Sequence, residues 1–359
     1  MMILTDFEKL AKQNKRRNIF KMVAISVMLS LLLIMLSFVG LNRLTSKNGQ
    51  KIQQYYAIIS EIAYPNISYS SWGYDATSQF TGHFVSHRFK DIDGISVPFE
   101  KYEHYYSLIL SQKSSANNNS LMSGDNGHSM YTRASHYKVP VFFNKGKKVQ
   151  LGAIKPTQDI PLLHQMSGQA VEVAVTFDKG YTLKEIEQFI PKNLKLNWIW
   201  SGIQFDYLES QFGFTPYFDL GLSAEQQKKM EAEIDKAYKS KKHPDLNPIY
   251  QKYDSKSAVS PVEGMENSYT VFQNRLEQYL KMKESDWQTV TSEHGEVYSS
   301  KAMLKEYLRQ NKDPKTAKFD GVILTGRAEN FAQLQNADWV YASNIGQSIQ
   351  IQPYHQLEK

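Results

Sequence analysis

The sequence predicts an α+β protein with a single N-terminal transmembrane helix, followed by extracellular mixed α/β domains. Three observations support this fold class. Twenty uncharged residues run from Met22 to Leu41, the next stretch alternates as β-strands do, and the second half places helical stripes between apolar strands. Hydrophobic residues make up 41% of the 359 residues and aromatic residues 13%, which is the composition of a folded protein.

Charge and cysteine content exclude two classes of function. The chain has a net charge of +6, but residues 1–21 alone hold six Lys or Arg against two acidic residues, a net +4. Because the basic excess lies beside the apolar run, we expect no direct nucleic-acid binding. The chain contains no cysteine, so disulfides, thiolate zinc sites and cysteine nucleophiles are impossible.

The apolar run has the length of a membrane-spanning helix. Twenty residues at about 1.5 Å each span ~30 Å, the thickness of a bilayer core. A cleaved signal has a shorter apolar region of roughly 7–15 residues and a small-x-small cleavage site. The end of this run, "SFVGLNRL", offers no such site, and no charged residue interrupts the run as in a soluble core helix. We therefore expect residues 22–42 to be a retained transmembrane helix.

The flanking charges predict the orientation of this helix. Six Lys or Arg precede the run, whereas Arg43, Lys47 and Lys51 follow it. The positive-inside rule then places the N-terminus in the cytoplasm and residues 43–359 outside the cell. No second apolar run of 18 residues is present, so we predict a single-pass protein of the cell membrane.

Residues 1–21 form a cytoplasmic stub with a helical pattern. Thr5-Asp6-Phe7-Glu8 fits a capping box, in which Thr5 and Glu8 each bond the other's backbone N–H. This helix either lies on anionic membrane lipid or docks onto a cytoplasmic partner. The residues that we expect to make the contact are Phe7, Leu10, Lys12, Arg16 and Arg17.

Residues 43–160 are predicted to be a β-rich region. A helix continues from the membrane over Lys51–Ile62 and ends at Pro65. Alternating strands then follow as far as Phe99, with a turn in "KDIDGISVPF". We expect a short helix over Tyr102–Leu110 and a polar surface loop or domain seam over Ser114–Met130.

Residues 161–355 are predicted to be an α+β domain built from two strand–helix–strand passages. The first runs from the apolar strand "AVEVAVTF" through a helix capped by Thr182 and Glu185 to "LKLNWIWSGI". The second combines "FDGVILTG", "ENFAQLQ" and "WVYASNI". Helices over residues 223–241 and 269–283, and around Met303 to Leu308, separate the two passages.

Several segments resemble the membrane-anchored sigma factor regulators, or anti-sigma factors, of Gram-positive bacteria. The N-terminal likeness runs from the basic stub to "SEIAYPNISYSS" and "FKDIDGISVPFE". The C-terminal likeness covers "VTFDKGYTLKEIEQFIPKNLKLNWIW" and "GVILTGRAENFAQLQNADWVYASNIGQSIQIQPY". The resemblance implies control of an extracytoplasmic-function sigma factor, in response to an envelope signal. The partner of the stub would be that sigma factor or a second membrane regulator.

The sequence offers few candidates for chemistry. His83 and His87 share one face of a predicted strand and are weak metal-ligand candidates, because no third ligand lies nearby. Ser135 and Lys138 fit S-x-x-K, but the accompanying S-D-N and K-T-G motifs are missing. We therefore expect no catalytic residues, no cofactor and no enzymatic activity.

The aromatic residues of the C-terminal domain allow a second interpretation. Most of them fit core packing, but "QFDYLESQFGFTPYFDLG" could instead form an exposed groove for a glycan or peptide. The candidates for such a groove are Tyr207, Phe212, Phe214 and Tyr217. The alternative function is then a membrane-tethered binding or scaffold protein of the cell envelope, with an inert anchor.

Overall fold

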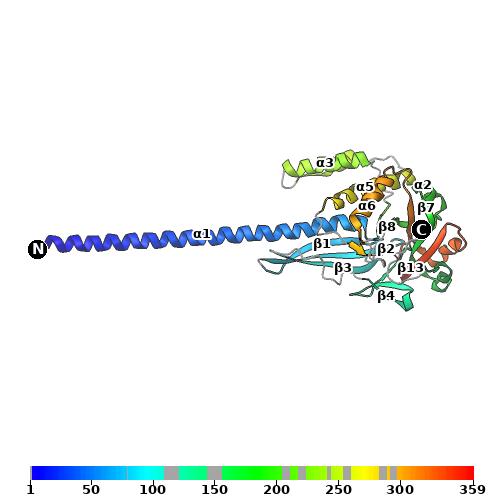
Figure 1. Ribbon diagram of the computed structural model, residues 1–359, viewed down its shortest axis with the longest axis horizontal. Coiled ribbons are helices and arrows are strands. Elements are labelled where there is room, and N and C mark those ends of the chain that lie inside the picture. Colours follow the sequence, from blue (N-terminus) through cyan, green and yellow to red (C-terminus); the bar gives the residue numbers. More distant parts are fainter. Residues whose placement is uncertain are drawn as a thin grey trace. The chain divides into compact units, whose positions relative to one another are not determined.

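The computed structural model begins with one long helix, α1 (Met2–Ile62) (Figure 1). The structure describes residues 2–78, 80–108, 121–143, 156–203, 211–216, 224–240, 244–253, 260–282, 289–291 and 297–359. α1 contains the stub, the apolar run and the predicted Lys51–Ile62 helix without a break. Because it begins at Met2, Thr5 lies inside the helix and not at the predicted cap.

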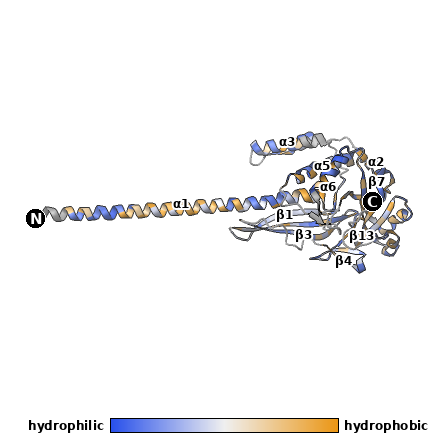
Figure 2. Ribbon diagram, viewed as in Figure 1, coloured by the Kyte–Doolittle hydropathy of each residue, from blue (hydrophilic) through white to orange (hydrophobic). Residues whose placement is uncertain are grey.

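The apolar part of α1 is long enough to cross a membrane. Figure 2 shows this stretch as a largely hydrophobic segment of the helix. Its large side chains are exposed all round, with Met28 and Ile34 67% and 65% accessible. A helix with apolar side chains on every face needs an apolar solvent, and a lipid bilayer provides one.

The chain divides into two compact units. The anchor unit comprises Met1–Ile52, Tyr74–Phe84 and His104–Lys113, and the main unit comprises Gln53–Gly73, Val85–Glu103 and Ser114–Lys359. Three strands, β1 (Ser68–Ala76), β2 (Thr81–Ile92) and β3 (Ile95–Ser107), contribute residues to both units and form a sheet in the order β1-β2-β3.

The turn between β2 and β3 consists of Asp93 and Gly94. Their φ angles of 54° and 89° are both positive, as a tight hairpin turn requires, and Gly94 adopts such an angle at little cost. The predicted helix over Tyr102–Leu110 is wrong, because β3 continues to Ser107 with Tyr102 and His104 buried on alternate positions. Tyrosine favours strands, and burial alternates with a period of two residues over Tyr102–His104.

The main unit is built around a five-stranded sheet with the order β13-β7-β12-β8-β9, and neighbouring strands are antiparallel. Helix α2 begins at the predicted capping box of Thr182 and Glu185. The first predicted strand–helix–strand passage contains β7 and β8, and the second contains β12 and β13. Because β12 lies between β7 and β8, the strands of the two passages alternate in one sheet. The elements of this sheet are β7 (Gln169–Tyr181), α2 (Leu183–Phe189), β8 (Lys195–Ile203), β9 (Phe212–Phe214), β12 (Phe319–Arg327) and β13 (Val340–Gln350).

Aromatic side chains fill the core of this sheet. Phe142 stacks on Trp200 with 4.7 Å between ring centroids, and Trp198 and Ile323 complete this cluster. Such stacked pairs add to the hydrophobic stabilisation of the buried area. Helix α5 (Pro261–Leu280) presents Tyr269 and other rings to the β9 side of the sheet.

The remaining described elements are helices, short strands and 3-10 turns. The predicted loop over Ser114–Met130 contains a strand, a 3-10 turn and the start of a second strand in its described part. The predicted "ENFAQLQ" helix is of the 3-10 type. These elements are β4 (Leu121–Gly124), β5 (Ser129–Thr132), β6 (Lys138–Val139), α3 (Ala224–Ser240), α4 (Asn247–Tyr253), β10 (Thr289–Thr291), β11 (Val297–Ser299), α6 (Ser300–Gln310) and 3-10 turns over Asp125–Gly127, Ile160–Met166 and Ala328–Leu334.

Candidate functional site

The last turns of α1 pack against helix α5 inside the main unit. Glu61 Oε2 accepts a charge-assisted hydrogen bond from Arg275 Nε at 2.6 Å. Six residues before Glu61 on α1, Tyr55 packs near Tyr279 of α5, with 6.2 Å between the ring centroids. These two contacts connect the last turns of α1 to α5.

A buried ion pair joins β2 to β7, and so links the N-terminal and C-terminal parts of the chain. Lys90 on β2 and Glu172 on β7 are both fully buried, and Lys90 Nζ lies 2.7 Å from Glu172 Oε2 and 2.9 Å from Oε1. Burial lowers the pKa of Lys90, and the charge and hydrogen bonds of Glu172 oppose this shift.

The Glu172 carboxylate has two further donors. Asn66 Nδ2 donates to Oε1 at 2.8 Å, and the backbone N–H of Gln347 on β13 donates to Oε2 at 3.1 Å. Gly346 makes this approach possible, since a Cβ at that position would lie 2.2 Å from Oε2. Both carboxylate oxygens are thus satisfied, which is the condition under which a buried charge is tolerated.

Asn66 connects this ion pair to the centre of the sheet. It adopts a φ of +50°, a left-handed conformation that Asn tolerates better than most residues. Besides Glu172, its Nδ2 donates to Asp91 O at 3.0 Å, and its Oδ1 accepts from Asn197 Nδ2 at 3.0 Å. The amide of Asn66 therefore bonds to β2, β7 and β8 at once.

The network ends at the turn between β2 and β3. Thr325 on β12 donates to Asn197 Oδ1 at 2.7 Å and accepts from the backbone N–H of Asp93 at 3.0 Å. We call Asn66, Lys90, Asp93, Glu172, Asn197 and Thr325 the polar junction; all six are buried. Hydrogen bonds are directional, so a buried network of this kind allows only one alignment of the strands that it joins. Apolar packing alone restricts that alignment less strictly.

The last described residues cover the polar junction at the same turn. The backbone N–H groups of Glu358 and Lys359 donate to Asp93 O and Asp93 Oδ1 at 3.2 and 2.9 Å. Lys195 forms ion pairs with Asp91 and Glu358. Burial raises the pKa of Asp93 to about 6, although these backbone donors and Lys195 oppose the shift.

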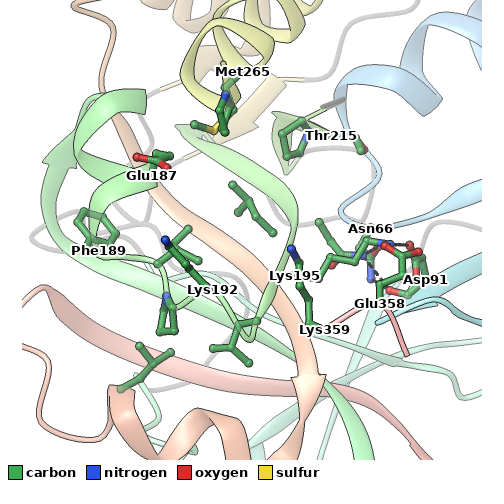
Figure 3. A pocket seen from close by; sticks show the side chains of 18 of the residues that line it. Asn66, Asp91, Glu187, Phe189, Lys192, Lys195, Thr215, Met265, Glu358 and Lys359 are labelled. Atoms are coloured by element: carbon green, nitrogen blue, oxygen red, sulfur yellow. Dashed lines mark hydrogen bonds and ion pairs between the residues drawn. The ribbon is translucent and has the colours of Figure 1, made fainter. Parts of the chain in front are cut away.

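An open pocket of about 1440 Å³ lies beside the polar junction (Figure 3). Asn66, Asp91 and Lys195 form the wall that it shares with the polar junction. The other walls mix apolar and charged side chains, among them Phe189, Pro191, Pro216, Met265, Trp339, Glu187, Lys192 and Lys359. A pocket with apolar walls and charges of both signs suits an amphiphilic or zwitterionic ligand better than a simple ion.

Two family profiles match this chain. The sigma factor regulator N-terminal profile matches residues 8–97, and the sigma factor regulator C-terminal profile matches residues 163–347. The chain belongs to the sigma factor regulator family. Comparison with curated proteins gives no significant match, nor does comparison with solved structures. Its fold class is confirmed, since a long apolar helix precedes a mixed α/β region.

The polar junction joins the two matched regions of this sigma factor regulator. Asn66, Lys90 and Asp93 belong to the N-terminal match, whereas Glu172 and Asn197 belong to the C-terminal match. The family's members regulate sigma factors, which agrees with the predicted regulatory role and implies a sigma factor as partner. The candidate span in α1 agrees with a membrane-anchored regulator.

The two histidines considered as metal ligands lie on β2 as the alternation predicts. His83 is half-buried and stacks on Tyr105 with 4.3 Å between ring centroids, while His87 is exposed. Within the described part of the chain, no group of three or more His, Asp or Glu side chains is arranged to hold a metal ion.

The aromatic groove receives no support from the residues that can be located. Phe212 and Phe214 on β9 are only 2% and 3% exposed, so the expectation that they face solvent is not met. Phe212 packs on Tyr279 and Phe214 on Tyr269, which makes both part of the core between β9 and α5. Tyr207 and Tyr217 lie outside the described residues.

The stub residues lie on α1 with exposed side chains. Phe7 and Leu10 are large apolar residues that nothing in the described chain covers, and Lys12, Arg16 and Arg17 are exposed as well. An exposed apolar pair beside basic residues fits both interpretations of the stub, as a lipid contact or as a docking helix.

The residues of the polar junction were not among those predicted from the sequence. Glu172 is the one acidic residue in the apolar strand "AVEVAVTF", and a lone charge in a buried strand predicts a buried partner. Lys90 falls on the same face of β2 as the buried Phe84 and Ile92. The sequence could have flagged both residues, but not that they pair across 82 positions.

Proposed function

We propose that this sigma factor regulator is a single-pass anti-sigma factor or co-regulator of an extracytoplasmic-function sigma factor. Its stub contacts the sigma factor, alone or together with a second membrane regulator, in the cytoplasm. Its main unit lies on the outer side of the cell membrane and binds an envelope signal. The proposal rests on the family and on the charge asymmetry around the span.

The observation that carries the proposal is the composition of α1. One helix contains the exposed stub, the apolar span and the turns that hold Arg275 and Tyr279 of α5. A ligand transmits information only if it has different affinities for two states of the protein. Contacts between α1 and α5 that differ between ligand-free and ligand-bound states would provide those states.

The pocket beside the polar junction is the place where we expect the signal to bind. Thr215, Pro216 and Met265 line it next to β9 and α5, while Asn66 and Lys195 line it at the junction. A ligand in this pocket touches both matched regions of the chain, so it can favour one arrangement of the α1–α5 contact over another.

A stub variant tests the sigma factor contact. Phe7→Ser with Leu10→Ser removes the two exposed apolar side chains, and Gln13→Ser with Asn14→Ser is the matched polar control on the same helix. We expect the first pair to abolish co-purification of the full-length membrane protein with its sigma factor and to raise target-gene expression. The control pair should do neither. If both pairs leave co-purification and expression unchanged, the stub is not the sigma factor contact.

A second experiment tests signal binding. An unrelated folded module replaces residues 63–359, with the stub, the span and all of α1 retained. We expect the chimera to bind the sigma factor but to lose the change in target-gene expression under envelope stress. An unchanged stress response would exclude the main unit as the sensor.

A deletion of residues 2–14 distinguishes the regulator from the scaffold alternative. If the deletion leaves transcription unchanged but impairs the cell envelope, the result favours the membrane-tethered scaffold protein.

A further inference from the structure

The end of β3 is hydrogen-bonded to α1 beyond the end of the apolar run, and Phe80 is hydrogen-bonded to this end of β3. Within the anchor unit, Asn48 Nδ2 donates to Ser107 O at 2.9 Å and to Leu108 O at 3.1 Å. The backbone N–H of Leu108 in turn donates to Phe80 O at 2.8 Å. Phe80, at the tip between β1 and β2, is therefore connected to the helix through two successive hydrogen-bond steps.

A second contact holds the same strands one residue farther along the helix. Tyr74 Oη donates to Gly49 O at 3.1 Å. The Tyr106 ring packs directly on Gly49, where an added Cβ would lie 3.0 Å from its Cζ. These contacts fix the tips of β1 and β3 at the level of residues 48 and 49.

This level lies just beyond the polar layer of a bilayer. At about 1.5 Å per residue, Asn48 lies ~10 Å beyond Leu41 along the helix axis. The headgroup layer extends roughly 5–8 Å beyond each side of the hydrocarbon core. A phenylalanine at the tip can bridge the small remaining distance, and a helix tilt of about 20° brings the tip closer still.

The exposed side chains here have the chemistry of a membrane interface. Phe80, Tyr74 and Tyr105 are 42%, 37% and 52% exposed, and Arg43 and Lys47 are exposed on the adjoining turns of α1. Aromatic rings concentrate at the headgroup level, and basic side chains bind anionic lipid. Asp75 is the acidic side chain described on these strand tips, so the cationic residues prevail.

We propose that Phe80 and the adjoining ends of β1 and β3 dock onto the headgroup layer of an anionic lipid bilayer, as a second membrane contact beside the span. Phe80 inserts among the headgroups, and Arg43 and Lys47 bind lipid phosphates. The inference rests on the membrane anchor of the proposed function, but not on which side of the membrane the main unit lies. Two attachment points restrict the tilt of α1, so headgroup composition affects the state of the helix.

The cysteine-free chain permits a direct test. Phe80→Cys carries an environment-sensitive nitrobenzoxadiazole label in the full-length protein, reconstituted in nanodiscs of phosphatidylglycerol and phosphatidylcholine. Quenching by a nitroxide on the lipid headgroup is compared with quenching by aqueous iodide. We expect several-fold stronger quenching by the lipid nitroxide at Phe80→Cys, and the same preference at Tyr105→Cys.

Two further labels make the outcome unambiguous. Ser70→Cys is exposed on β1, six residues and about 20 Å before the end of that strand, and should favour iodide. Val23→Cys lies in the apolar run and should be shielded from iodide. If Val23→Cys is shielded but Phe80→Cys and Tyr105→Cys both favour iodide, the docking proposal is overturned and the anchor stands. If Val23→Cys is open to iodide, the anchor itself fails.

Discussion

The ammonium group of Lys90 lies 2.7 Å from the carboxylate of Glu172, and both side chains are fully buried. One residue belongs to the N-terminal regulator region and the other to the C-terminal region. Desolvation of two charges costs several kcal/mol each, so such a pair contributes little net stability but strongly opposes any state that separates its members. We regard the polar junction as the element that keeps the two regions in one arrangement.

A double-mutant cycle measures this coupling. Lys90→Met and Glu172→Gln each leave a buried group without its charged partner, so we expect each to lower the free energy of unfolding by about 3–5 kcal/mol. The double variant should lose less than the sum of the two, by more than about 1 kcal/mol. The measurement is urea unfolding of the full chain in detergent, followed by intrinsic tryptophan fluorescence, to which the buried Trp198 and Trp200 contribute. Additive losses would contradict the pairing.

Asn66 combines a left-handed backbone with three side-chain hydrogen bonds, and two substitutions separate these contributions. Asn66→Gly removes the bonds but keeps the backbone relaxed, and we expect a loss of roughly 1–3 kcal/mol. Asn66→Ala adds the strain of a positive φ, about 1–2 kcal/mol more. Thermal unfolding of both variants checks the order, and an alanine variant at least as stable as the glycine variant would refute this account of the backbone.

Asp93 makes stability depend on pH in a stated direction. Its pKa in the folded protein is about 6, above the ordinary 3.8, so the folded state binds the proton more tightly than the unfolded state. Stability therefore falls as pH rises from about 4 to 6. The side-chain amide introduced by Asp93→Asn stays neutral, and asparagine suits the left-handed turn, so this part of the decline should disappear. Burial also raises the pKa of Glu100, so Glu100 still contributes to the decline of stability with rising pH in this variant.

Unfolding midpoints of the full chain across this pH range check the prediction for Asp93→Asn. The variant should be more stable than the unmodified protein near pH 7, and the two should converge near pH 4. Parallel curves at all pH values would show that Asp93 ionises normally in the folded protein.

The Tyr106 ring requires glycine on β2. A Cβ at Gly82 would lie 2.2 Å from Tyr106 Cζ, whereas a Cβ at Gly73 on β1 would meet no atom within 4 Å. We expect Gly82→Ala to destabilise the anchor unit by about 1–3 kcal/mol through overpacking. Hydrogen exchange at residues 80–84 and 104–108 should accelerate. Gly73→Ala is the control and should leave exchange there unchanged; equal effects of both would exclude the clash as the cause.

The fold was predictable where local pattern decides it. The apolar run identified a helix long and apolar enough to span a membrane, the Thr182–Glu185 capping box marked the start of α2, and the alternation of Val171, Val173 and Val175 indicated β7. The predicted helix at Tyr102 failed because a cluster of tyrosines fits both periods, and pairing in the sheet decided for the strand.

The candidate site was less predictable because its partners are distant in sequence. Lys90 and Glu172 are 82 residues apart, and Asp93 and Thr325 are 232 apart. No local period relates such positions. Phe212 and Phe214 show the converse problem, since an aromatic cluster has the same sequence signature in a binding groove and in the core that they occupy.

The most direct test of the central claim is photo-crosslinking from Phe7 of the full-length protein in its native membrane, with benzoylphenylalanine at that position. The adduct is identified by mass spectrometry, and the same probe at Gln13, which lies about 120° around the helix from Phe7, serves as the control. We expect an adduct with an extracytoplasmic-function sigma factor at Phe7, weaker or absent at Gln13. Adducts that contain lipid alone, with no sigma factor at either position, would contradict it.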